Sequence, residues 1–142
     1  MDSCAFCRVI RGEEEHNLVF EDSVSVAFLD RRPLFPGHIL LVPKEHIGTL
    51  ADLSADLVGP LFVNAQLLAR AVEQAMAAEG YFVAINNKIS QSVPHVHIHI
   101  VPRNRGDGLK GFFWPRHPYR DEAHALEVRD RIREAVERIS NE

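Results

Sequence analysis

The chain has few cysteines and no long apolar run, and both absences restrict the class of protein it can be. Only two cysteines occur in 142 residues, whereas a secreted domain stapled by disulfides would normally carry more. No segment approaches the roughly 18 consecutive apolar residues of a membrane-spanning helix. The first residues, Met-Asp-Ser-Cys, also lack the basic region and following apolar run of a secretory signal. We therefore expect a cytoplasmic protein with no membrane contact.

An excess of basic charge is missing too. The formal net charge is -4 at pH 7 and the isoelectric point is near 6.0, whereas a general nucleic-acid binder presents a basic face. We expect no nucleic-acid partner, so any anionic ligand must be held by a local site. The apolar fraction of 46% and the charged fraction of 25% are ordinary for a globular protein. The sequence therefore predicts a single domain over residues 1–142.

Histidine residues, by contrast, cluster in one short stretch of the sequence. Three of the eight histidines lie within five residues, in the stretch from His95 to Val101. In a strand the three imidazoles project from one face, about 6.6 Å apart, while the intervening Val and Ile side chains point to the other. Near neutral pH an imidazole can act as a nucleophile, a proton carrier or a metal ligand. This stretch therefore predicts a functional site on an anchored strand.

Further segments around this stretch carry a family resemblance. Together these segments cover roughly residues 4 to 103 and follow one another in the same order as in a known protein family. A set of ordered segments is far more specific than an alternating histidine strand alone. The chain resembles the histidine triad (HIT) family of nucleotide hydrolases and transferases. In chain order the matching segments are Ala27-Phe28-Leu29-Asp30, Pro36-Gly37-His38, Leu41-Val42-Pro43-Lys44-Glu45-His46, Gln91-Ser92-Val93, His95 to Val101, and Pro102-Arg103.

The resemblance implies chemistry at the α-phosphorus of a nucleotide. The middle histidine of the triad, here His97, attacks phosphorus and forms a nucleotidyl-histidine that water or another acceptor resolves. His99 and His38 then stabilise the phosphoryl oxygens and assist the leaving group, together with Ser92. The choice of nucleophile has independent support: if a metal holds the His95 ring, that ring is not the nucleophile, while the His95 carbonyl can orient His97 through its Nδ1–H.

Cys4 and Cys7 form a Cys-x-x-Cys pair, which by itself is half of a zinc site. Relatives with such a leading pair complete the site with the residues that correspond to His46 and His95, so the resemblance implies a closed, structural zinc site. Two free thiols without a metal remain an alternative. A redox pair is disfavoured because too few residues precede Cys4 to form the usual strand.

The resemblance also implies a nucleoside pocket. Phe28 corresponds to an aromatic that packs against the base, and Asp30 to a carboxylate that accepts ribose hydroxyls, although an Asp in this position is often only a turn-former. The candidate phosphate-side residues are Asn86, Gln91 and Ser92. Here the loop from Asn86 to Gln91 lacks the glycines found in many relatives, a departure that affects the phosphate contacts.

The hydrophobic pattern agrees with an α+β, HIT-like domain. We expect an antiparallel sheet of about five strands, with a main helix and a carboxyl-terminal helix at 121–140 packed on it. The main helix is capped by Ser54, ends near Gly80, and bends or restarts near Pro60. An aromatic loop at 110–119 is predicted to cover the nucleotide site, a subunit interface or its own core. The strands are expected at 17–20, 24–29, 39–42, 82–85 and 95–101.

The favoured function is hydrolysis of nucleoside 5′-phosphoramidates or of dinucleoside polyphosphates, with release of a nucleoside monophosphate. Two alternatives remain open: nucleotidyl transfer or phosphorolysis with phosphate or a sugar phosphate as acceptor, and a nucleotide-binding sensor without turnover. The resemblance also implies a homodimer. Apart from zinc, no cofactor is expected.

Overall fold

The computed structural model describes residues 3–14, 17–110 and 116–142. It divides the chain into two compact units, Met1–Asp107 and Gly108–Glu142, and each is described by itself. The predicted cover formed by Phe112, Phe113 and Trp114 lies outside the described residues. None of the described helices is long and apolar enough to cross a membrane.

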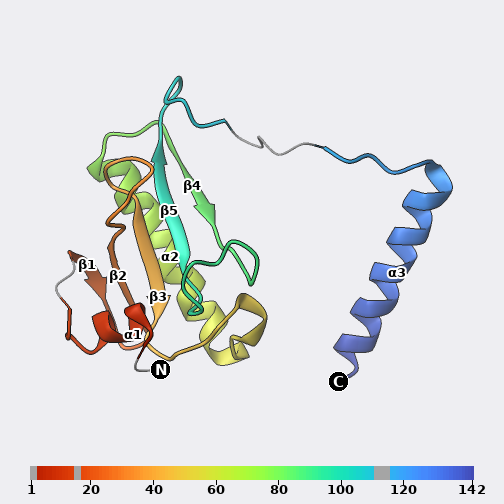
Figure 1. Ribbon diagram of the computed structural model, residues 1–142, viewed down its shortest axis with the longest axis horizontal. Helices are drawn as coiled ribbons and strands as arrows, with labels where there is room; N and C mark the ends of the chain where they lie inside the picture. The colour runs from red at the N-terminus through yellow and green to blue at the C-terminus, as the bar shows by residue number, and fades with distance from the viewer. Residues whose placement is uncertain (1–2, 15–16, 111–115) are drawn as a thin grey trace. The chain divides into compact units, whose positions relative to one another are not determined.

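The first unit is built on a five-stranded antiparallel sheet in the order β1-β2-β3-β5-β4 (Figure 1). This confirms the predicted α+β class and sheet, and the ends of β1 to β4 agree with the sequence pattern to within two residues. The exception is β5, which begins three residues later than the predicted start at His95. The strands are β1 (Leu18–Glu21), β2 (Ser25–Leu29), β3 (Ile39–Pro43), β4 (Gly80–Ala84) and β5 (Ile98–Arg103).

Alternating side chains give the sheet two apolar faces, each covered by a different helix. Ile39, Leu41, Ile98 and Ile100 form a buried cluster with apolar side chains of α2 (Ala55–Ala75). The intervening residues of β2 and β3 pack with residues at and next to the short helix α1 (Ala5–Ile10). Because the strand period is two, the histidines that alternate with Ile98 and Ile100 face the side of α1.

Helix α2 tests two of the predictions. It continues through Pro60, with buried Leu57 and Leu61 on either side of the proline, so of the two predicted alternatives, a bend or a restart, the restart does not occur. It also ends at Ala75 rather than near Gly80: Ala77 takes the left-handed conformation with φ of 49°, and Gly80 begins β4. Ser54 is the N-cap residue, as expected, although its side chain makes no capping hydrogen bond.

Two further helices lie in the described part of the chain. A single 3-10 turn, η1 (Leu50–Asp52), precedes α2. In the second unit, α3 (Glu122–Ser140) begins after Asp121, whose carboxylate accepts a hydrogen bond from the His124 N–H at 2.8 Å. This N-cap explains why the helix starts where the sequence predicted.

Candidate functional site

The histidine stretch crosses from a loop into the sheet. Strand β5 begins at Ile98, so His95 and His97 precede the ladder. The Val96 N–H donates to the Ile47 carbonyl at 2.7 Å, and this bond ties the segment to the loop after β3. The predicted alternation holds nevertheless, since Ile98 and Ile100 are fully buried on the α2 side.

His97 has one ring nitrogen fixed by the backbone. Its Nδ1 lies 2.8 Å from the His95 carbonyl oxygen, and because a carbonyl only accepts, Nδ1 carries the proton. The ring is 3% exposed and packs edge-on against Phe6, with centroids 5.0 Å apart. In the neutral ring, Nε2 of His97 then carries the lone pair, the form that a nucleophilic imidazole requires.

His38 and His99 form a second ordered pair. The Leu34 N–H donates to Nδ1 of His38 at 3.0 Å, so His38 carries its proton on Nε2. That nitrogen lies 3.0 Å from Nδ1 of His99 and donates to it, which leaves the proton of neutral His99 on Nε2. The hydrogen bond from the Leu34 N–H and the bond between the two rings thus fix the tautomers of His38 and His99.

Electrostatics keep this pair neutral. Burial, then the nearby His97 and His38 rings, lowers the pKa of His99 to about 4, although Asp30 acts in the opposite direction. Burial likewise lowers the pKa of His38 against the attraction of Asp30, whose Oδ2 lies 3.5 Å from Nε2 of His38. At neutral pH, His99 is therefore a neutral hydrogen-bond donor through Nε2.

A cavity of about 230 Å³ opens beside these rings, with His97, His99, Ser92, Phe28 and Asp30 in its wall. A larger cavity of about 700 Å³ shares part of that wall. Asp30 lines both cavities, and its Oδ1 also accepts the Arg32 N–H at 2.9 Å. Asp30 therefore both stabilises a turn and lines a cavity, so its predicted roles as a turn-former and as a pocket carboxylate are compatible.

Two of the predicted phosphate-side residues lie elsewhere. The Gln91 side chain braces its own loop, accepting the Lys88 N–H at 2.8 Å and donating to the Gly48 carbonyl at 2.6 Å. Among the described residues, neither Gln91 nor Asn86 lines either of these two cavities. Their role in nucleotide binding stays a prediction.

Phe6 and Glu14 are cavity residues that the sequence did not single out. Phe6 lies between the two cysteines and packs against Phe28, with ring centroids 5.5 Å apart, as well as against His97. An aromatic inside a Cys-x-x-Cys pair was a signal available in the sequence. Glu14 lies in a charged segment that carries no such signal.

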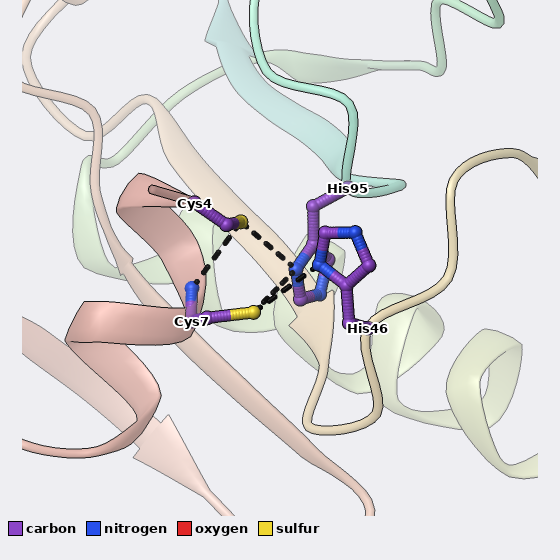
Figure 2. A group of neighbouring side chains, drawn as sticks. All are labelled: Cys4, Cys7, His46 and His95. Atoms are coloured by element: carbon purple, nitrogen blue, oxygen red, sulfur yellow. Dashed lines mark hydrogen bonds between the residues drawn. The ribbon is translucent and has the colours of Figure 1, made fainter. Parts of the chain in front are cut away.

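Next to the histidine row, Cys4, Cys7, His46 and His95 point toward one another from three parts of the chain (Figure 2). Cys4 is the N-cap residue of α1 and Cys7 lies within it, whereas His46 follows β3 and His95 precedes β5. One donor atom from each residue lies within 4.8 Å of all the others. Both cysteines and His95 are buried.

The geometry of this group fits a tetrahedral zinc ion. A sulfur and a nitrogen bound to one zinc lie about 3.6 Å apart, from the usual bond lengths and a tetrahedral angle. Nδ1 of His95 lies 3.5 Å from Sγ of Cys4 and 3.6 Å from Sγ of Cys7, and Nδ1 of His46 lies 3.2 Å from Sγ of Cys7. Nε2 of His95 donates to the Pro43 carbonyl at 2.9 Å, so Nδ1 carries the lone pair that a metal needs.

A model of the HIT domain matches residues 11–106 of the chain. Adenylylsulfatase HINT3 of Arabidopsis thaliana is 34% identical over 110 residues, which are 76% of this chain and 56% of that protein. The chain thus spans little more than half the length of this relative. Adenosine 5'-monophosphoramidase hnt1 of Schizosaccharomyces pombe is 36% identical over 118 residues, 82% of this chain and 86% of hnt1.

Among solved structures, the chain is similar to a Zn-bound histidine triad family protein from Mycobacterium smegmatis. The two share 35% sequence identity and superpose with a TM-score of 0.72. The similarity covers 88% of this chain and 90% of the other. The extent of this match supports a common fold across most of the described chain.

Proposed function

The chain belongs to the histidine triad (HIT) family, and on that premise we propose that it hydrolyses nucleotide substrates at the α-phosphorus and releases a nucleoside monophosphate. The observation that carries this proposal is the fixed tautomer of His97, whose Nδ1–H donates to the His95 carbonyl at 2.8 Å. The lone pair of Nε2 is thereby available at a cavity wall. Relatives named as an adenylylsulfatase and an adenosine 5'-monophosphoramidase support the substrate class.

The reaction has two steps. Nε2 of His97 forms a bond to the α-phosphorus as the bond to the leaving group breaks, and the leaving group takes a proton from solvent. Water then attacks phosphorus, loses a proton to solvent, and releases the monophosphate with His97 restored to its neutral form. The His95 carbonyl, 2.8 Å from Nδ1, stabilises the positive charge that the His97 ring carries in between.

The neighbouring residues act on the phosphoryl group. The Nε2–H of His99, fixed by the His38 bond of 3.0 Å, hydrogen-bonds a phosphoryl oxygen, and a fixed donor of this kind contributes about 3 kcal/mol to the transition state. Ser92, in the same cavity wall, assists the leaving group. Phe28 contacts the nucleoside and Asp30 accepts ribose hydroxyls.

The test offers an adenosine 5′-phosphoramidate and a diadenosine polyphosphate side by side to the wild type and to His97→Asn. The expected result is release of AMP by the wild type and its loss in the variant, with the two wild-type rates identifying the preferred substrate. His124→Asn is the matched control, because His124 is a histidine of α3 in the second unit. Unchanged turnover in His97→Asn would refute the assigned nucleophile.

The same assay separates the two alternatives. Turnover that rises on addition of phosphate or a sugar phosphate, with a nucleoside diphosphate or nucleotide sugar as product, would identify transfer. Tight binding of AMP without turnover of any substrate would identify a sensor. Catalysis is favoured over a sensor because His38, His95, His97 and His99 are all present, with complementary hydrogen bonds.

Cys4, Cys7, His46 and His95 would hold the zinc ion. When bound, it supplies a structural cross-link between α1, the loop after β3 and the segment before β5. Metal analysis of the purified protein is expected to give close to one zinc per chain, and Cys7→Ser should lose both zinc and thermal stability. Less than about half an equivalent, with stability unchanged in Cys4→Ser and Cys7→Ser, would contradict the site.

The remaining predictions from the sequence concern the whole protein. A single HIT domain over residues 1–142, a homodimer and a cytoplasmic location stay proposals. Sedimentation of the purified full chain would test the dimer directly.

A further inference from the structure

The loop between β4 and the histidine stretch has a strained backbone. Lys88 has φ of 70° and Ser90 has φ of 61°. A Cβ makes this left-handed region unfavourable, so glycine occupies it far more readily than lysine or serine. The loop from Asn86 to Gln91 contains no glycine. Contacts with the rest of the chain must therefore hold Lys88 and Ser90 in this conformation.

Side-chain packing contributes little to this loop, because Lys88, Ile89 and Ser90 are exposed and Ile89 is 82% exposed. The Gln91 amide makes the contacts instead. Its Oε1 accepts the Lys88 N–H at 2.8 Å, and its Nε2 donates to the Gly48 carbonyl at 2.6 Å. One side chain thus connects the backbone of a left-handed residue to the segment that follows β3.

Two neighbouring hydrogen bonds make that segment a fixed support. The Leu50 N–H donates to Oδ1 of Asn87 at 2.8 Å, and the Val96 N–H donates to the Ile47 carbonyl at 2.7 Å. Gly48 lies between Ile47 and Leu50 in the sequence, so the acceptor of the amide hydrogen bond is held from both sides. Loss of the Gln91 side chain would therefore release the loop and leave its support in place.

We propose that Gln91 is a positioning residue, whose amide holds the loop in the left-handed conformation and thereby places Ser92 in the cavity wall. Ser92 follows Gln91 directly and lines the smaller cavity together with His97. The role of Ser92 at the leaving group rests on the proposed function, whereas the anchoring of the loop does not. This role differs from the direct phosphate contact that the family resemblance implies, because both polar atoms of the amide bond to the backbone of the chain itself.

A double-mutant cycle of Gln91→Ala and Lys88→Gly tests the proposal. With an adenosine 5′-phosphoramidate as substrate, Gln91→Ala should lower kcat about fivefold or more while KM stays within about twofold, because a lost hydrogen bond is worth about that factor and the nucleoside contacts remain. Glycine adopts a positive φ without support. In the Lys88→Gly background, Gln91→Ala should therefore lower kcat only about twofold or less.

Ala77→Gly is the matched control. Ala77 also has a positive φ, of 49°, but it follows α2 and is not a partner in the Gln91 hydrogen bonds. This substitution should leave the loss caused by Gln91→Ala unchanged. If Ala77→Gly reduced that loss as much as Lys88→Gly does, the rescue would come from general stabilisation and the positioning role would be wrong.

An unchanged kcat in Gln91→Ala, or an equal loss in both backgrounds, would overturn the proposal. A rise in KM with kcat unchanged would also overturn it, since that is the result expected of a direct nucleotide contact. Urea denaturation of the same variants separates the proposal from the proposed function. The unfolding midpoint should fall in Gln91→Ala and fall less in the Lys88→Gly background, and equal falls would contradict the anchoring. If the midpoints behave as expected but no substrate is cleaved, the proposed hydrolysis fails and the anchoring by Gln91 stands.

Discussion

Neutral His99 makes the stability of the protein depend on pH in a defined direction. Burial and the His97 and His38 rings lower the pKa of His99 from 6.5 to about 4, with Asp30 opposing them. Between these two values the unfolded chain binds a proton that the folded chain does not. Stability from this group is therefore fully present above about pH 6.5 and is lost as the pH falls toward 4.

The size of the effect follows from the same two values. At pH 5 an unfolded histidine with its ordinary pKa is almost fully protonated, whereas His99 in the folded protein is about nine-tenths neutral. Linkage then gives a loss of about 2 kcal/mol in the free energy of unfolding between pH 7 and pH 5. The His38 pKa, also lowered by burial, adds a loss of the same sign.

Urea denaturation at pH 7 and pH 5 measures this loss in the wild type and in His99→Gln, which keeps an acceptor for the His38 Nε2–H but does not titrate. The free energy of unfolding should fall by about 2 kcal/mol more in the wild type than in the variant. His117→Gln, which replaces an exposed histidine, should follow the wild type. An equal fall in wild type and His99→Gln would show that His99 titrates normally in the folded protein and refute the reasoning.

Two further substitutions test how the site is supported. Gly37→Ala should lower the free energy of unfolding by about 1–3 kcal/mol, because Gly37 has φ of 97° and an added Cβ would lie 2.6 Å from Cγ of Met76. It should also reduce turnover, because Gly37 directly precedes His38. An unchanged midpoint of urea unfolding would contradict the expected strain. Asn64→Ala should lower the free energy of unfolding by about 1–3 kcal/mol without changing nucleotide affinity. The buried Asn64 amide donates to Asp22 at 2.7 Å and to Ser25 at 2.8 Å, and none of these three residues lines either cavity. A larger dissociation constant for AMP, with stability intact, would contradict this purely structural role.

Local periodicity predicted much of the fold because each element follows from nearby residues. Alternation around Ile98 and Ile100 identified both the strand and the face on which the histidines lie. Asp121 marked the start of α3 through a hydrogen bond made within its own first turn. At Pro60 the sequence left a bend or a restart open, and the helix does not restart. Whether a proline interrupts a helix depends on the packing around it as well as on the missing hydrogen bond, and here the neighbouring Leu57 and Leu61 are buried.

The features of the candidate site were likewise determined in part by the sequence and in part only by the tertiary structure. The sequence alone specified the residue types: four donors suited to zinc, and a histidine row that resembles a known family. The sequence also led to the Nδ1–H of His97, because the His95 carbonyl that accepts it at 2.8 Å lies only two residues away. Only the tertiary structure decided which ring nitrogen of His99 carries the proton, because strand pairing brings the His38 ring to it. It also brought Glu14 and Asp30 into one wall shared by two cavities. Contacts between residues distant in sequence depend on how the chain packs, and no spacing in a single sequence encodes them.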